Sequence, residues 1–198
     1  MKNAANRMPL IDAMKAIASI IIVVHHLVIY GPLSKAMQSF VPALSDWLFD
    51  YGRIAVQVFL VIAGFLAARA LSPEGEGLRS SPLPLLWKRY LRLVVPYLAA
   101  IGLAIAAAAM ADHWMDDEAI PDRATFKQWL AHAFLVQGVL GFDALSAGVW
   151  YIAIDFQLFA LMALLLWSGR QRFVAPALVL LVALTSLFWF NRNAEWDN

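Results

Sequence analysis

The sequence predicts an all-α fold, a polytopic bundle of about five transmembrane helices with a cytoplasmic N-terminus. Of the 198 residues, 62% are hydrophobic and only 15% are charged, and the mean hydropathy of +0.68 is far above that of a soluble domain. Several apolar runs are each long enough to cross the ~30 Å hydrocarbon core of a bilayer as a helix. The bilayer is therefore the first expected partner. Basic residues gather at the borders of these runs and not on one soluble face, which excludes nucleic acid as a partner.

Short polar segments separate the apolar runs. The expected spans are residues 8–29, 54–71, 87–110, 149–167 and 173–190. The first is expected to be retained, because no small-residue cleavage site follows it. Residues 30–53 are expected to form a loop broken at Pro32 and Gly52. Residues 126–142 are short and half polar, which predicts an interfacial or re-entrant helix.

The short loops predict the orientation of the chain. Basic residues fall on the side of the N-terminus, which the positive-inside rule makes cytoplasmic: Lys2, Arg7, Arg69, Arg79, Lys88, Arg89, Arg92, Arg170 and Arg172. Acidic residues fall on the other side: Asp46, Asp50, Asp112, Asp116, Asp117, Glu118 and Asp122. With five crossings the C-terminus is expected outside.

The first span opens with Lys15 and closes with His25 and His26. Eleven helical steps return to within ~20° of the start, so Lys15 and His26 share one face about 16 Å apart. His25 points roughly 100° away from His26. Ionisable groups inside a span are costly and usually face a cavity. The alternative is that Lys15 snorkels to the inner interface beside Asp12 while the histidines sit among the outer headgroups.

The third span begins with basic residues. Arg89 and Arg92, at i and i+3, are expected to project together beside Lys88. An arginine pair suits phosphate groups because the guanidinium donates two parallel hydrogen bonds. The alternative is a topological anchor at the cytoplasmic border.

The fourth span carries Asp155 and Gln157, one to two turns below the predicted outer surface. An acid at that depth needs a partner, and pairing with His26 would hold the imidazole in one tautomer. A structural hydrogen bond between helices is the alternative. In the second span, Gln57 signals a polar contact only weakly.

Four sequence blocks, in order and register, resemble the membrane-bound acyltransferase 3 family. They are "IDAMKAIASIIIVVHH", "AVQVFLVIAGFL", "RYLRLVVPY" and "VWYIAIDFQLF". The chain departs from the family pattern at three positions: Lys15 replaces an arginine, Ala63 a serine and Asp155 a glutamate. Because the family typically has about ten membrane helices, the resemblance implies that residues 1–198 form the N-terminal half of the domain.

The resemblance implies an O-acyltransferase of the inner (plasma) membrane. Such an enzyme moves an acyl group, commonly acetyl, from cytoplasmic acyl-coenzyme A to a hydroxyl of a cell-surface carbohydrate or similar acceptor. His26 is then the general base, oriented by Asp155, and the donor phosphates are bound by Lys15, Arg89 and Arg92. The supporting residues expected around them are Asp12, His25, Gln57, Trp150 and Gln157.

The donor is expected as a substrate, with no permanently bound cofactor. A metal site built from His25, His26, His113 and His132 is not expected, because adjacent histidines diverge on a helix. A covalent acyl-histidine relay stays open. Two other classes also stay open: a truncated or non-catalytic partner subunit, and a membrane transporter. In either case we expect the charged spans to be covered by further helices or by self-association.

Overall fold

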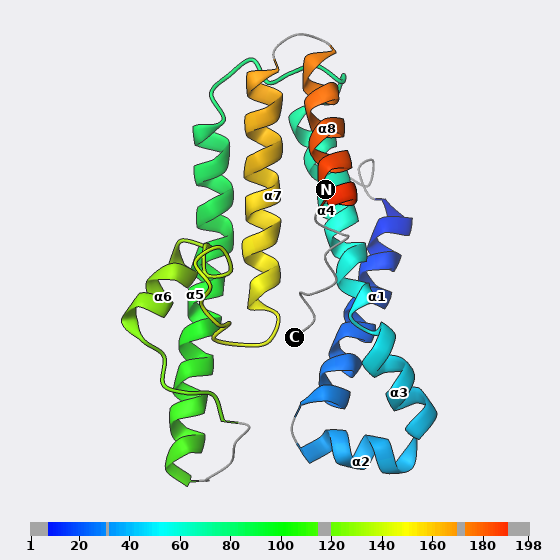
Figure 1. Ribbon diagram of the computed structural model, residues 1–198, viewed down its shortest axis with the longest axis vertical. Coiled ribbons are helices and arrows are strands. Elements are labelled where there is room, and N and C mark those ends of the chain that lie inside the picture. The colour runs from blue at the N-terminus through cyan, green and yellow to red at the C-terminus, as the bar shows by residue number, and fades with distance from the viewer. Residues whose placement is uncertain (1–7, 31, 115–119, 170–172, 190–198) are drawn as a thin grey trace, which may run out of the picture. The chain divides into compact units, whose positions relative to one another are not determined.

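The computed structural model describes residues 8–30, 32–114, 120–169 and 173–189. Within them the secondary structure is entirely helical, which confirms the all-α class (Figure 1). The helices are α1 (Pro9–Ile29), α2 (Pro32–Phe40), α3 (Pro42–Tyr51), α4 (Ile54–Leu71), α5 (Leu83–Trp114), α6 (Phe126–Ala133), α7 (Val149–Ser168) and α8 (Val174–Trp189). Of the charges on which the predicted orientation depends, seven lie outside these ranges: Lys2, Arg7, Asp116, Asp117, Glu118, Arg170 and Arg172.

Four stretches of described helix are long and apolar enough to cross a membrane. They are Pro9–Ile29, Pro42–Leu71, Leu83–Trp114 and Val149–Ser168. The helix α8 is also apolar but spans 16 residues, so the predicted fifth crossing stays a prediction.

The chain divides into two compact units. The first comprises Met1–Phe65 and Ile105–Arg123, and the second comprises Leu66–Ala104 and Ala124–Asn198. The helices α4 and α5 are each divided between the two units. Residues 54–65 and 105–114 belong to the first unit, and residues 66–71 and 83–104 belong to the second.

In the first unit, α1 packs against α2 and α3. The expected loop at residues 30–53 is wrong, because most of it forms these two helices. Pro32 and Pro42 each begin a helix. The first helical position needs no N–H donor and favours the fixed φ of proline, so these prolines start helices instead of breaking them.

In the second unit, α7 and α8 pack on the end of α4. The buried cluster consists of Leu71, Ala163, Leu166 and Ala175. The linker between α4 and α5 lies against this cluster, since the Leu78 N–H donates to the Leu166 carbonyl at 2.8 Å.

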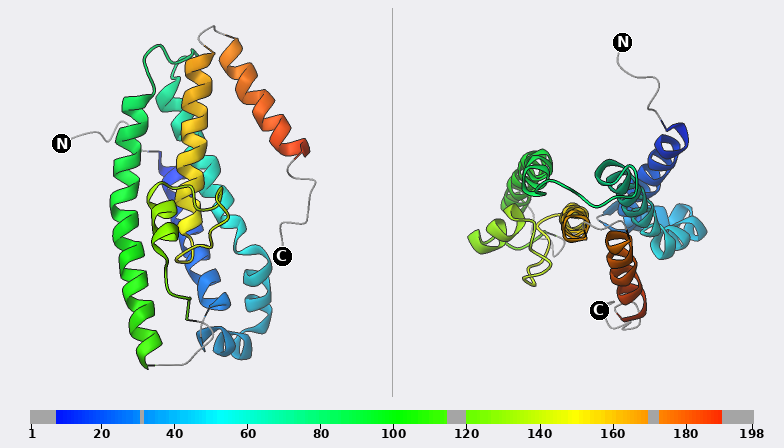
Figure 2. Two further views of the ribbon diagram at one scale, coloured as in Figure 1. Left: turned by 60° about the vertical axis from the view of Figure 1, so that its left-hand side comes forward. Right: turned by 90° about the horizontal axis from the view of Figure 1, so that it is seen from above.

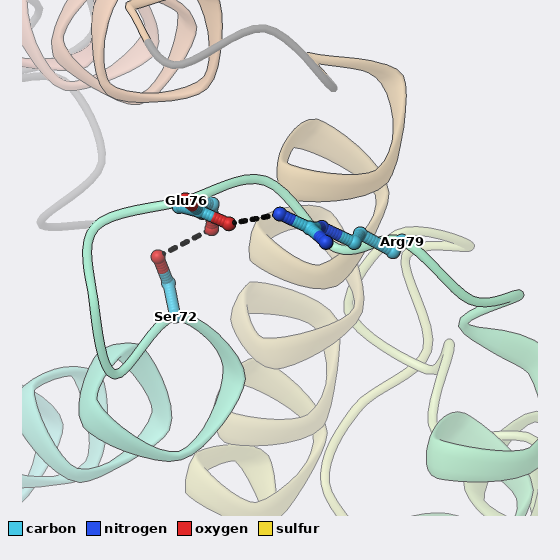
Figure 3. A network of polar contacts seen from close by, with 3 residues as sticks. All are labelled: Ser72, Glu76 and Arg79. Carbon is cyan, nitrogen blue, oxygen red and sulfur yellow. Dashed lines mark hydrogen bonds and ion pairs between the residues drawn. The ribbon is translucent and has the colours of Figure 1, made fainter.

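Polar contacts order the same linker (Figure 3). The Ser72 hydroxyl donates to the Glu76 carbonyl at 2.6 Å, and Arg79 pairs with the Glu76 carboxylate at 2.7 Å. The two charged side chains are 87% and 49% exposed. The ion pair is therefore worth little stability, and Arg79 remains available as a topological charge.

Candidate functional site

The second unit contains an ion pair inside a predicted span. Arg89 Nη2 donates to Asp155 Oδ2 at 2.7 Å, and the side chains are 28% and 10% exposed. The Arg89 guanidinium also lies over the Phe159 ring, 4.2 Å from its centroid. Asp155 and Phe159 are one turn apart on α7, so the arginine crosses the ring to reach the carboxylate.

This contact differs from the expected partner of Asp155, which was His26. In the structure the carboxylate accepts from Arg89. His26 belongs to the other compact unit, so a second contact between Asp155 and His26 stays a prediction.

The position of Arg89 along its helix also differs from the predicted one. Because α5 begins at Leu83, four residues before the predicted start, Arg89 lies ~9 Å along the helix and not at its first turn. Asp155 likewise lies ~9 Å from the start of α7. Both charged residues thus lie beyond the first turn of their helices, and each compensates the charge of the other.

The neighbouring basic side chains behave differently. Lys88 and Arg92 are both exposed, and neither has a hydrogen-bond or ion-pair partner among the described residues. The two arginines of the predicted pair therefore differ in their contacts: Arg89 is bonded to α7, and Arg92 has no such partner among the described residues. Of the two arginines, Arg92 has the guanidinium available for an incoming anion.

In the first unit, the two histidines of α1 have different surroundings. His25 is 3% exposed, and its Nδ1–H donates to the Leu48 carbonyl at 2.7 Å. His26 is partly buried, its ring packs edge-on against Tyr30 with centroids 5.7 Å apart, and its Nδ1 has no hydrogen-bond partner among the described residues. One imidazole is anchored by a hydrogen bond, and the Nδ1 of the other is buried without one among the described residues.

The remaining predicted site residues lie at partly or fully exposed positions. Lys15 is partly buried, and Asp12 and Gln57 are exposed. None of the three has a side-chain partner within the described ranges. Trp150, in the first turn of α7, is 37% exposed.

An apolar cavity of about 460 Å³ lies between α1, α3 and α4. Its walls include Ile17, Val58 and the aromatic side chains of Trp47 and Tyr51. The volume is within the range of ligand sites. Its lining suits hydrocarbon and offers nothing to a phosphate.

Buried polar side chains, which the sequence did not single out as site residues, fix the predicted re-entrant segment onto α5. The Tyr90 hydroxyl donates to the Ala133 carbonyl at 2.9 Å. Gln137, 2% exposed, donates to the Tyr97 hydroxyl at 3.1 Å. These contacts place α6 and the turns after it beside α5 (Figure 2).

Two further contacts complete this framework. Gln157 of α7 donates to the Leu135 carbonyl at 2.7 Å, which gives the predicted supporting residue a structural contact. His132 is fully buried: its Nδ1–H donates to the Gln128 carbonyl at 2.8 Å, and its Nε2 accepts from the Leu145 N–H at 3.1 Å. Both ring nitrogens are engaged, so His132 is a neutral structural histidine. The described residues include no cluster of three or more potential metal ligands.

Residues 9–197 match the model of the acyltransferase 3 family, described as an acyltransferase domain. The chain belongs to this acyltransferase family. No curated protein and no solved structure matches the chain. The match covers nearly the whole chain, so the resemblance carried by the four sequence blocks is confirmed.

The four blocks of the acyltransferase lie on α1, α4, α5 and α7. Each of these helices belongs to one of the four candidate membrane spans. The chain is thus a membrane acyltransferase whose four sequence blocks lie on helices of the candidate spans. Two groups of predicted site residues lie on these helices: the histidine pair near the end of α1, and the basic cluster near the start of α5, of which Arg89 is paired with Asp155 of α7.

Proposed function

We propose that this acyltransferase moves an acyl group, specifically acetyl, from cytoplasmic acyl-coenzyme A to a hydroxyl of a cell-surface carbohydrate or similar acceptor. The plasma membrane is the proposed location. The observation that supports this most is the contrast between the two histidines of α1, since the Nδ1 of His26 has no hydrogen-bond partner among the described residues whereas His25 is anchored. A histidine that acts as a general base needs a ring that is not held by a structural hydrogen bond on both nitrogens.

In the proposed reaction, His26 takes the proton of the acceptor hydroxyl as its oxygen attacks the thioester carbonyl carbon. The new C–O bond forms, the C–S bond breaks, and the imidazolium returns the proton to the departing thiolate. The products are the acylated acceptor and free coenzyme A. General-base catalysis of this kind contributes about 10²- to 10⁴-fold, so positioning must supply the rest.

In the second unit, Arg92 is the proposed phosphate-binding residue, and Lys15 of the first unit stays a predicted one. Arg92 is exposed at the start of the third predicted span, and Lys15 lies at the predicted inner end of the first. Arg89 contributes differently, because its charge is already paired with Asp155. We assign the Arg89–Asp155 pair to holding α5 against α7, and so to orienting the helix that carries Arg92.

The test is transfer of radiolabel from acetyl-coenzyme A in membranes that contain the chain. His26→Ala is expected to lower transfer by at least about 100-fold. His113→Ala is the matched control, because His113 is an exposed histidine near the end of α5, outside the proposed site. Equal transfer by the wild type and His26→Ala would refute the proposed role of His26.

A further inference from the structure

We propose that His25 is a positioning residue for His26: its hydrogen bond to α3 fixes the rotation of α1 and thereby the direction of the neighbouring imidazole. This inference rests on the proposed function, in which His26 is the base. His25 itself touches no substrate in this proposal.

The anchor is a buried bond between two helices. His25 is 3% exposed, and its Nδ1–H donates to the Leu48 carbonyl at 2.7 Å. The same carbonyl accepts the Gly52 N–H at 2.9 Å, so both of its lone pairs are used. The bond therefore joins the last turns of α1 to the C-terminal end of α3, where a helix carbonyl carries partial negative charge.

Glycine at position 52 makes room for this contact. A Cβ on Gly52 would lie 2.7 Å from both the Cβ and the Nδ1 of His25, and 2.6 Å from the Leu48 carbonyl oxygen. The backbone of Gly52 is right-handed helical, with φ −59° and ψ −33°, so any residue could adopt it. Space, and not conformation, requires the glycine.

His26 has no comparable anchor. Its Nδ1 is buried without a partner among the described residues, and its ring contacts only the neighbouring rings of His25 and Tyr30 in the recorded aromatic pairs, each at 5.7 Å. Consecutive residues of an α-helix are fixed about 100° apart. A rotation of α1 that freed His25 would therefore turn His26 by the same angle.

The experiment compares two substitutions of His25. His25→Asn keeps an N–H donor close to the position of Nδ1, whereas His25→Leu removes the donor. We expect His25→Leu to lower kcat by about 10- to 100-fold through misplacement of the base, with the donor KM changed less than about threefold. His25→Asn should recover most of kcat.

Glycine substitutions perturb the same bond from the other side. Gly52→Ala keeps both histidines but crowds the ring, so it should reproduce the His25→Leu effect. Gly102→Ala is the matched control, because a Cβ there meets no atom within 4 Å. If His25→Leu reduces the amount of folded protein, Gly52→Ala still tests the inference, because it keeps both histidines.

A second readout does not depend on activity. The rate at which diethyl pyrocarbonate modifies His26 in membranes, measured by mass spectrometry, should change about five- to tenfold in His25→Leu and Gly52→Ala, since each removes one hydrogen bond. His25→Asn and Gly102→Ala should match the wild type.

Unchanged modification rates in both perturbed variants would overturn the inference. So would a His25→Asn variant as inactive as His25→Leu, because the imidazole itself would then be needed. Failure of the proposed function would give a different result, because His26→Ala would stay active. The modification rates would still report whether His25 orients its neighbour.

Discussion

The Arg89–Asp155 pair makes a quantitative prediction about stability. Asp155→Asn leaves the arginine charge inside the span without its carboxylate. Breaking a buried pair from one side costs about 3–5 kcal/mol, and a lone charge at the centre of a span costs about 2.5–3.5 kcal/mol on insertion scales. Because Arg89 keeps 28% of its side chain exposed, water or headgroups relieve part of this cost. We expect a loss of about 2–3 kcal/mol in the free energy of unfolding.

Arg89→Gln is expected to cost a similar amount, since it strands a carboxylate that is 10% exposed. The double variant Arg89→Gln/Asp155→Asn removes both charges and should be less destabilised than the sum of the single variants by about 1–3 kcal/mol. Arg92→Gln is the control: its side chain is exposed, and its loss should change stability by less than about 0.5 kcal/mol.

The assay is unfolding of the purified chain from mild detergent into sodium dodecyl sulfate, followed by tryptophan fluorescence. Two results would refute the reasoning. In the first, either single variant is no less stable than Arg92→Gln. In the second, the loss of stability in the double variant equals the sum of the losses in the two single variants. Each outcome would mean that the pair carries no coupling energy and that Arg89 is as free as Arg92 to bind the donor.

Three other outcomes follow from the structure. Arg92→Ala should raise the apparent donor KM by about 10- to 100-fold, because a charged hydrogen bond is worth about 1.5–3 kcal/mol; unchanged donor saturation would leave Arg92 as a topological anchor only. His132→Phe should lower the free energy of unfolding by about 2–4 kcal/mol, since both ring nitrogens make buried hydrogen bonds; a loss below about 1 kcal/mol in the same detergent assay would contradict the framework role. Single cysteines at Ser80 and Ala144 should react with an impermeant reagent from opposite faces of the membrane, which is a clean test because the chain has no native cysteine; labelling from one face would contradict the orientation.

Helix positions could be predicted well from the sequence where apolar runs are long. The predicted span 54–71 coincides with α4, and 149–167 falls one residue short of α7. Twenty-residue apolar runs bounded by charges leave few alternatives. The prediction is wrong at residues 30–53, where the expected loop contains two helices that begin at Pro32 and Pro42. Proline is compatible with both a loop and a first helical turn, and only packing against α1 decides between them.

The pairing of Asp155 could not be predicted from the sequence, and the membership of the candidate site stays a prediction. Sequence spacing gives the depth and the face of Asp155, but it cannot say which of several cationic groups on other helices meets it. The packing of α5 against α7 decides this, and the structure shows that Arg89 meets the carboxylate. His132 and Gln137 were missed as buried groups because their partners are distant backbone and side-chain atoms. The signal available was the Thr125–Gln128 capping box, which marks where α6 begins.

The pairing of Arg89 changes how charge is divided in the proposed mechanism. The Arg89 guanidinium is bonded to Asp155 and stacked on Phe159, so binding a phosphate there would compete with a charge-assisted bond. Arg92 has no such competing partner among the described residues. A donor phosphate should therefore bind at Arg92, while Arg89 keeps α5 and α7 in register. This division accounts for two arginines at i and i+3 with different exposures: one fixes the helix, and the other uses that fixed position.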